Sequence, residues 1–303
     1  MGLIDKLIRG SYKDDKKTSV FPHTRKEVFV QLFRYHKRTL LNVGLMCALF
    51  ALPTVAAVLL SVLYKAYIPA LIADGSIVPP VADDTMLSTV LLEMQVDRLV
   101  CLVLIPTNAL IFVGLSGGVH VIRQAAWGEN VSFFYDFGRG IKQNCKHYLV
   151  YALIFGLSLL FCVFVVGYYS VSQSHAAVRI ISIAVAVTQF LTVSGVLVFA
   201  LSYADIYTSS IAKELRNAFI FFIVGLPKNI GLLILTAVPL LLLLIPSAIA
   251  QTVSALAIAL LFPSYAILIW VLRGDAVFDR YVNFGDNARI AGKGIVWDEQ
   301  DPA

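Results

Sequence analysis

Charged residues are scarce in this 303-residue sequence and make up 14% of it. From Asn229 to Leu272 there is no Asp, Glu, Lys or Arg at all, and this run is about twice the roughly 20 residues that an α-helix needs to cross a bilayer. Hydrophobic residues reach 59% and the mean hydropathy is +0.81, which is far from the composition of a soluble domain. The sequence therefore predicts a polytopic membrane protein.

The sequence also lacks the patterns that carry chemistry. Its five histidines are scattered and its four cysteines form no CxxC pair, so the ligand spacing of a metal site is missing. There is no HExxH, GxSxG or GxxxxGK motif, and the interior of the predicted spans holds no acid, base or nucleophile constellation. We therefore expect no catalytic residues, no metal and no cofactor, and a protein that is not an enzyme.

Six charge-poor spans can be placed on the sequence. The long run after Asn229 has one polar interruption, around Pro246 and Gln251, and so divides into two spans joined by a short turn. The runs do not show the alternating pattern of an outer-membrane barrel, so they are expected to be helices. The fold class is therefore all-α, with six transmembrane helices. The four earlier spans are Thr39 to Tyr64, Leu99 to Ile122, Tyr148 to Tyr169 and Ile180 to Ala204.

Lys and Arg are distributed unevenly between the two sides that these spans define. Of the 24, 21 lie on one side, and only Lys65, Arg98 and Arg179 lie on the other. The positive-inside rule then predicts a multi-pass plasma-membrane protein with both termini in the cytoplasm. Attraction to anionic lipid explains the net charge of +5, so we expect the lipid bilayer as a partner and no nucleic acid.

The spans divide the chain into three parts. Residues 1–38 are expected to form a basic cytoplasmic tail, residues 39–272 the six-span membrane domain, and residues 273–303 a cytoplasmic C-terminal tail. Within the first tail, the apolar side chains of residues 3–8 fall on one face of a short interfacial helix. The first residues lack the apolar core and cleavage site of a signal peptide, so none is expected.

An internal repeat is visible where the chain enters the first, third and fifth spans. Each entry has aromatic residues, then a basic cluster, then a long apolar run: VFVQLFRYHKRTLLNVGL, SFFYDFGRGIKQNCKHYLVYAL and NAFIFFIVGLPKNIGLLIL. Phe33, Phe137 and Phe222 can be placed in register, which also aligns Asn144 with Asn229. The pattern predicts three parallel repeats, each an amphipathic helix followed by a two-helix hairpin.

These entry segments have two interpretations. They can be interfacial helices, with aromatic rings at headgroup depth and cations reaching the lipid phosphates. They can also form a docking surface for a cytoplasmic partner or transporter subunit. The residues of this predicted docking surface are Trp127, Phe134, Phe137, Lys142, Asn144, Phe222 and Lys228.

One of these segments resembles a known family. The stretch GGVHVIRQAAWGENVSFFYDFGRGIKQNCKHYL, which begins at Gly117, is similar to the signature of the YesL-like integral membrane proteins, a domain of unknown function. The segments LRNAFIFFIVGLPKN and FDRYVN are similar to two further family features. The resemblance implies a multi-span plasma-membrane protein of a family that is often discussed as an accessory to carbohydrate uptake, with no established activity and no catalytic residues to carry over.

The leading prediction is thus a non-enzymatic accessory or scaffold component of the membrane, with transporter subunits or further copies of itself as partners. The main alternative is a small transporter or permease subunit with a neutral polar site near Asn108 and Gln189, the two amides near mid-membrane. His120 and His147, near the inner ends of the second and third spans, could face each other.

Overall fold

The computed structural model describes residues 22–81, 84–171, 175–283 and 289–295. The described residues are helical or lie in turns, with no strand among them. Six of the helices are long and apolar enough to cross a membrane, which confirms the predicted fold class. The elements are α2 (Arg25–Tyr35), α3 (Lys37–Ala73), α4 (Thr85–Ala126), α5 (Phe133–Val171), α6 (Ala176–Ile206), α7 (Ile211–Val224), α8 (Leu226–Ala237), the 3-10 helix η1 (Val238–Leu244), α9 (Ala248–Phe278) and the π-helical turn η2 (Asp279–Asn283).

The helices form three hairpins, α3–α4, α5–α6 and α8/η1–α9. A separate amphipathic helix precedes two of them: α2 comes before α3 with a break at His36, and α7 comes before α8 with a break at Gly225. Before the second hairpin there is no break, because the aromatic segment from Phe133 is the first part of α5 itself. The charge-free run turns at 245–247, as predicted, where the Ser247 hydroxyl accepts a hydrogen bond from the Ala250 amide and begins α9.

One predicted boundary falls inside a helix of the structure. The C-terminal tail was placed after Leu272, where the charge-free run ends, yet α9 continues to Phe278. Its last turns are kept helical by side chains that pack inside the protein, among them Asp275 and Phe278. The interfacial helix predicted at residues 3–8 lies outside the described residues.

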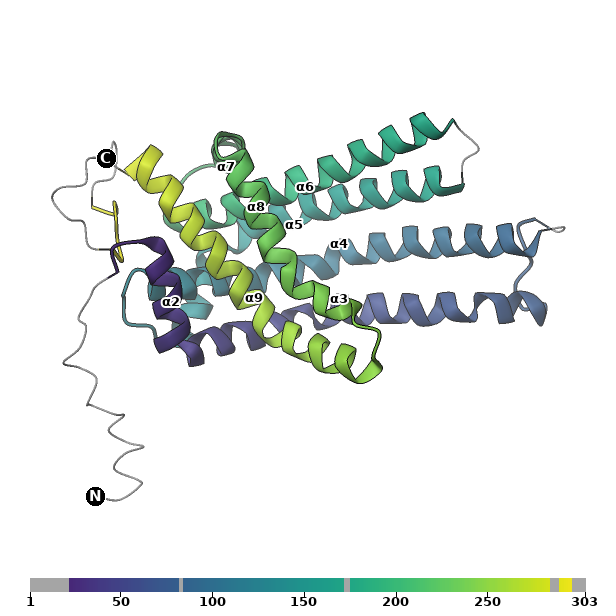
Figure 1. Cartoon of the computed structure of the whole chain (residues 1–303), viewed down its shortest axis with the longest axis horizontal. Helices are drawn as coiled ribbons and strands as arrows, with labels where there is room; N and C mark the ends of the chain where they lie inside the picture. Colours follow the sequence, from purple (N-terminus) through teal and green to yellow (C-terminus); the bar gives the residue numbers. More distant parts are fainter. Residues whose placement is uncertain (1–21, 82–83, 172–174, 284–288, 296–303) are drawn as a thin grey trace, which may run out of the picture.

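The second helices of the three hairpins, α4, α6 and α9, contact one another. In Figure 1 the α3–α4 and α5–α6 hairpins extend away from the end of the molecule at which α2 and α7 lie, and α9 crosses obliquely. We call this end the basic end, because it carries Arg123, Lys142 and Arg273. Burial is concentrated there: α4 is buried almost continuously from Ser116 to Ala126. Towards the other end, Leu, Val and Ile side chains are exposed, as expected of surfaces that face lipid.

The second and third repeats make equivalent aromatic contacts, and the first makes a related one. Phe137 of the second repeat packs on Gly117 of α4, and Phe222 of the third packs on Gly195 of α6. In the first repeat the aligned residue, Phe33, is 38% exposed. There Phe29 instead lies edge-on to Tyr265 of α9, with ring centroids 6.4 Å apart. Each aromatic segment therefore packs on the second helix of the preceding hairpin, and the contact of α2 with α9 closes the ring.

Candidate functional site at the basic end

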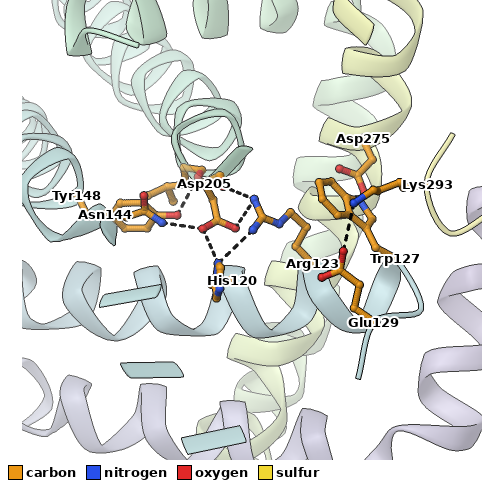
Figure 2. A network of polar contacts seen from close by, with 10 residues as sticks. His120, Arg123, Trp127, Glu129, Asn144, Tyr148, Asp205, Asp275 and Lys293 are labelled. Atoms are coloured by element: carbon orange, nitrogen blue, oxygen red, sulfur yellow. Dashed lines mark hydrogen bonds and ion pairs between the residues drawn. The ribbon is translucent and has the colours of Figure 1, made fainter. Parts of the chain in front are cut away.

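A carboxylate that is completely removed from solvent, Asp205, lies near the end of α6. His120 Nδ1 is 2.9 Å from its Oδ1, the Arg123 guanidinium is 2.8 Å from its Oδ2, and Asn144 donates a hydrogen bond of 2.6 Å. Arg123 also donates to the Asp205 backbone carbonyl. Figure 2 shows these side chains converging on Asp205 from α4 and α5. The carboxylate thus joins three spanning helices at one point.

The local sequence explains this convergence. His120 and Arg123 are three residues apart, so one face of α4 presents both to α6. On α5, Tyr148 lies one turn beyond Asn144 and its hydroxyl donates a 2.8 Å hydrogen bond to the Leu201 carbonyl. An unpaired buried charge is costly, whereas a carboxylate with a guanidinium and an amide is largely compensated. The cluster therefore fixes the spacing of α4, α5 and α6.

A second buried carboxylate, Glu214, lies in the first turn of α7 and is 0% exposed. His147 Nδ1 lies 2.7 Å from its Oε2, and the Tyr151 hydroxyl donates to the same oxygen. Ser209 donates to Oε1 at 3.2 Å. His147 and Tyr151 are four residues apart on α5, and a carboxylate in the first turn of a helix is favoured by the helix dipole. Glu214 therefore fastens the amphipathic α7 onto the second hairpin.

A third cluster joins α2 to the end of α9. Arg25 lies 2.6 Å from Asp279 and 3.7 Å from Asp275. Asp275 also accepts a 3.1 Å hydrogen bond from the indole nitrogen of Trp127. The Trp127 ring is flanked by the cations of Arg123 and Lys293, at 4.8 and 4.6 Å from its centroid. The clusters of Asp205 and Asp275 are thus linked through Trp127 and Arg123.

The residues after α9 complete this third cluster. The Asp279 carboxylate accepts hydrogen bonds from Asn283 at 2.8 Å and from the Gly292 amide at 3.1 Å. Tyr207, just after α6, donates to Asn283 at 2.5 Å. Burial raises the pKa of the Tyr207 phenol above its ordinary value, and the charges of Asp279 and Asp275 add to this effect. Tyr207 therefore stays protonated as a hydrogen-bond donor.

The three clusters fasten helices to one another. Each of the carboxylates of Asp205, Glu214, Asp275 and Asp279 is bonded to a cation, a histidine or a neutral donor of the same protein. Within the described part of the chain, no group of three or more His, Cys, Asp or Glu side chains is placed to hold a metal ion. The chemistry that this arrangement performs is the burial and pairing of charge.

The predicted docking surface is only partly exposed. Phe134, Lys142 and Lys228 are exposed and Trp127 is partly buried. The prediction is wrong for the other three residues: Phe137, Asn144 and Phe222 are 3, 7 and 3% exposed. The two Phe rings fill the space beside Gly117 and Gly195, and Asn144 is used by Asp205.

The amides and histidines singled out in the sequence lie apart. Asn108 is buried on α4, whereas Gln189 donates a 2.9 Å hydrogen bond to Ser158 across the α5–α6 hairpin. The cavity beside Gln189 is lined by α6 residues alone and does not include Asn108. His120 and His147 do not pair with each other, because each is bonded to a different carboxylate.

Sequence reasoning missed the buried acids of the basic end. Asp205, Glu214, Asp275 and Asp279 appeared to lie in loops and tails outside the spans. The available signal was that they are acidic residues within two turns of apolar runs, on a side that is otherwise strongly basic. An acid in that position is expected to pair with one of the nearby cations.

The chain was also compared with known proteins. No protein-family model, curated protein or solved structure matches it. The resemblance to the YesL-like proteins therefore stays a prediction. What is known of the fold and the site comes from the residues and contacts described above.

Proposed function

We propose that this protein is a non-enzymatic accessory or scaffold component of the cytoplasmic membrane, which holds a transport subunit at its basic end. The distribution of Lys and Arg favours a cytoplasmic position for that end. The resemblance of the segment from Gly117 to the YesL-like proteins favours a link to carbohydrate uptake. The integral membrane character follows from the six apolar helices, and the role at the basic end is the proposal.

The observation that carries the proposal is the exposed face at the start of α5. Phe134 and Tyr135 are 79% and 70% exposed, and Lys142 is exposed two turns further along. Directly beneath them, Phe137 is packed on Gly117 and Asn144 is bonded to Asp205. An aromatic and basic face on a rigid support is the composition of a protein-binding hot spot.

The start of α5 is itself fixed. The Asp136 carboxylate accepts a 2.7 Å hydrogen bond from the Ser132 amide, at the N-terminus of the helix. Asp136 is buried, at 5% exposure. The backbone that carries Phe134 and Tyr135 is therefore already helical, and a partner would have to order only the two side chains on binding.

Photo-crosslinking in cells tests this surface. A photoreactive amino acid placed at Phe134 is expected to give a discrete protein adduct, and the additional change Lys142→Ala is expected to weaken it. The matched control is the same amino acid at Leu157, an apolar position on α5 that is 51% exposed. Adducts with lipid only at both positions would assign Phe134 to the membrane interface and refute the docking role.

The alternative of a small permease has less support. It needs a polar site within the spans, but the cavity beside Gln189 does not include Asn108. The cavity between α3 and α4 is lined mainly by apolar side chains. If the alternative were right, Asn108→Ala and Gln189→Ala would each abolish uptake of the transported compound. Unchanged uptake in both variants would exclude it.

A further inference from the structure

A cavity of about 300 Å³ lies between the end of α7, the start of α8 and the end of α9. Three cations line it, Lys228 from α8, Arg273 from α9 and Arg280 from η2, and no carboxylate is among its lining residues. In the described part of the chain, none of these three forms an ion pair. The cavity is thus a concentration of unneutralised positive charge.

The helical segment formed by α9 and η2 has two different faces, which explains why these arginines have no acidic partner. Arg273, Val277 and Arg280 recur at intervals of three and four residues and face the cavity. The acids of the same segment, Asp275 and Asp279, face the other way and are bonded to Trp127 and Arg25. The segment therefore carries its cations and its anions on opposite faces. The anions are bonded to Trp127 and Arg25 and do not neutralise the cations of the cavity.

Arg273 is held in position from behind. Its Nε donates a 2.9 Å hydrogen bond to the side-chain oxygen of Asn229, which is 0% exposed. The Asn229 amide nitrogen donates in turn to the carbonyls of Phe222, at 2.8 Å, and Phe221, at 3.2 Å. These bonds satisfy carbonyls at the end of α7 and turn the guanidinium towards the cavity. The amide is neutral, so it does not compensate the partly buried charge of Arg273.

We propose that this cavity binds a phosphate group of an anionic ligand. A guanidinium presents a fork of donors that matches phosphate oxygens, and Lys228 and Arg280 add two further charges. Gly225 and Pro227, at the junction of α7 and α8, complete this part of the cavity wall. The ligand is either the headgroup of an anionic phospholipid or a soluble phosphate ester. Ile220, Ile223 and Val224, exposed on neighbouring α7, would lie along the acyl chains of a lipid.

The test is native mass spectrometry of the full-length protein, released from neutral detergent and titrated with phosphatidylglycerol or with neutral phosphatidylcholine. Lys228 and Arg280 are exposed, so Lys228→Gln/Arg280→Gln is expected to fold. Each juxtamembrane cation contributes about fivefold to binding of an anionic lipid, so the double variant should bind about 25-fold more weakly. The matched control is Arg139→Gln/Lys146→Gln, which removes the same charge from exposed positions on α5.

The ligand source is distinguished by a second arm, in which glycerol phosphate is added at constant ionic strength. Preference for phosphatidylglycerol that glycerol phosphate does not reverse assigns the cavity to lipid. Binding of glycerol phosphate that depends on Lys228 and Arg280, without preference between the lipids, assigns it to a soluble ester. Equal weakening in the two double variants, or binding of neither ligand, would overturn the proposal.

Discussion

Replacing Asp205 by Ala should destabilise the protein more than almost any other single change. The carboxylate is completely buried and bonds His120, Arg123 and Asn144, which come from α4 and α5. In the Ala variant the guanidinium of Arg123, 9% exposed, keeps its charge and loses its counter-ion. Removing one partner of a buried ion pair costs about 3 to 5 kcal/mol of unfolding free energy. Because Arg123 also bonds the Asp205 backbone carbonyl, which the substitution leaves in place, we expect the lower value, about 3 kcal/mol.

A double-mutant cycle separates the lost pair from a general disturbance of α6. Arg123→Leu removes the cation, and Arg123→Leu/Asp205→Ala removes both charges. Since an apolar pair leaves no unpaired charge, the double variant should be more stable than the sum of the single losses implies. We expect a coupling free energy of about 1.5 to 3 kcal/mol.

Unfolding can be followed in mixed micelles by tryptophan fluorescence, because Trp127 lies directly after α4 and Trp270 lies within α9. The free energies of the wild type, both single variants and the double variant then give the coupling directly. A loss below about 1 kcal/mol for Asp205→Ala, which is the range of an exposed ion pair, would contradict the described burial. Strictly additive losses would show that Asp205 and Arg123 do not act together.

Two further predictions concern the aromatic contacts between repeats. Gly195→Ala places a Cβ in the space of the Phe222 ring and should cost about 1 to 3 kcal/mol of unfolding free energy. In the control, Gly231→Ala, the new Cβ meets no atom within 4 Å, and the unfolding free energy should change by less than about 1 kcal/mol. Equal effects in the same micelle assay would refute the packing of Phe222 on α6. Phe137→Ala should cost about 3 to 5 kcal/mol of unfolding free energy, and Phe134→Ala should cost less than about 0.5 kcal/mol. A reversed order would show that Phe134, not Phe137, is the buried ring.

The spans could be predicted from the sequence because lipid tolerates only long apolar helices, and charge-free runs mark them directly. The lengths of the helices could not be predicted in the same way. The segment from Phe133 contains Arg139, Lys142 and Lys146, yet it continues into the third span without a break. Its polar residues lie beyond the apolar run that defines a span, so composition alone ends the helix too early.

The repeat was visible because an aromatic segment precedes each hairpin, and in the second and third copies the aligned ring, Phe137 or Phe222, performs the same packing task. The assignment of Phe137 and Phe222 to a surface was wrong for a related reason. Aromatic residues near a span entry are typical of the membrane interface, but here glycines on the neighbouring helix make room for the rings. Which glycine meets which ring is a tertiary contact that spacing within one segment does not reveal.

The buried acids were missed for the same reason. Asp205 gains its significance from partners 61 to 85 residues away in the chain. Until α4, α5 and α6 are brought together, its sequence context is that of an ordinary residue at a helix end. Asp205 pairs with His120 and Arg123 because of the way in which the three hairpins are arranged. The charge pattern of the sequence alone does not specify that arrangement.

The most direct test of the proposed accessory role is quantitative affinity purification in mild detergent. Tagged wild type would be compared with Phe134→Ala/Lys142→Ala, and with Leu157→Ala as a lipid-facing control. The proposal predicts that a transport subunit is recovered with the wild type and the control and is lost from the double variant. Recovery of the protein alone, or of the same subunit from all three, would contradict a docking role for the basic end.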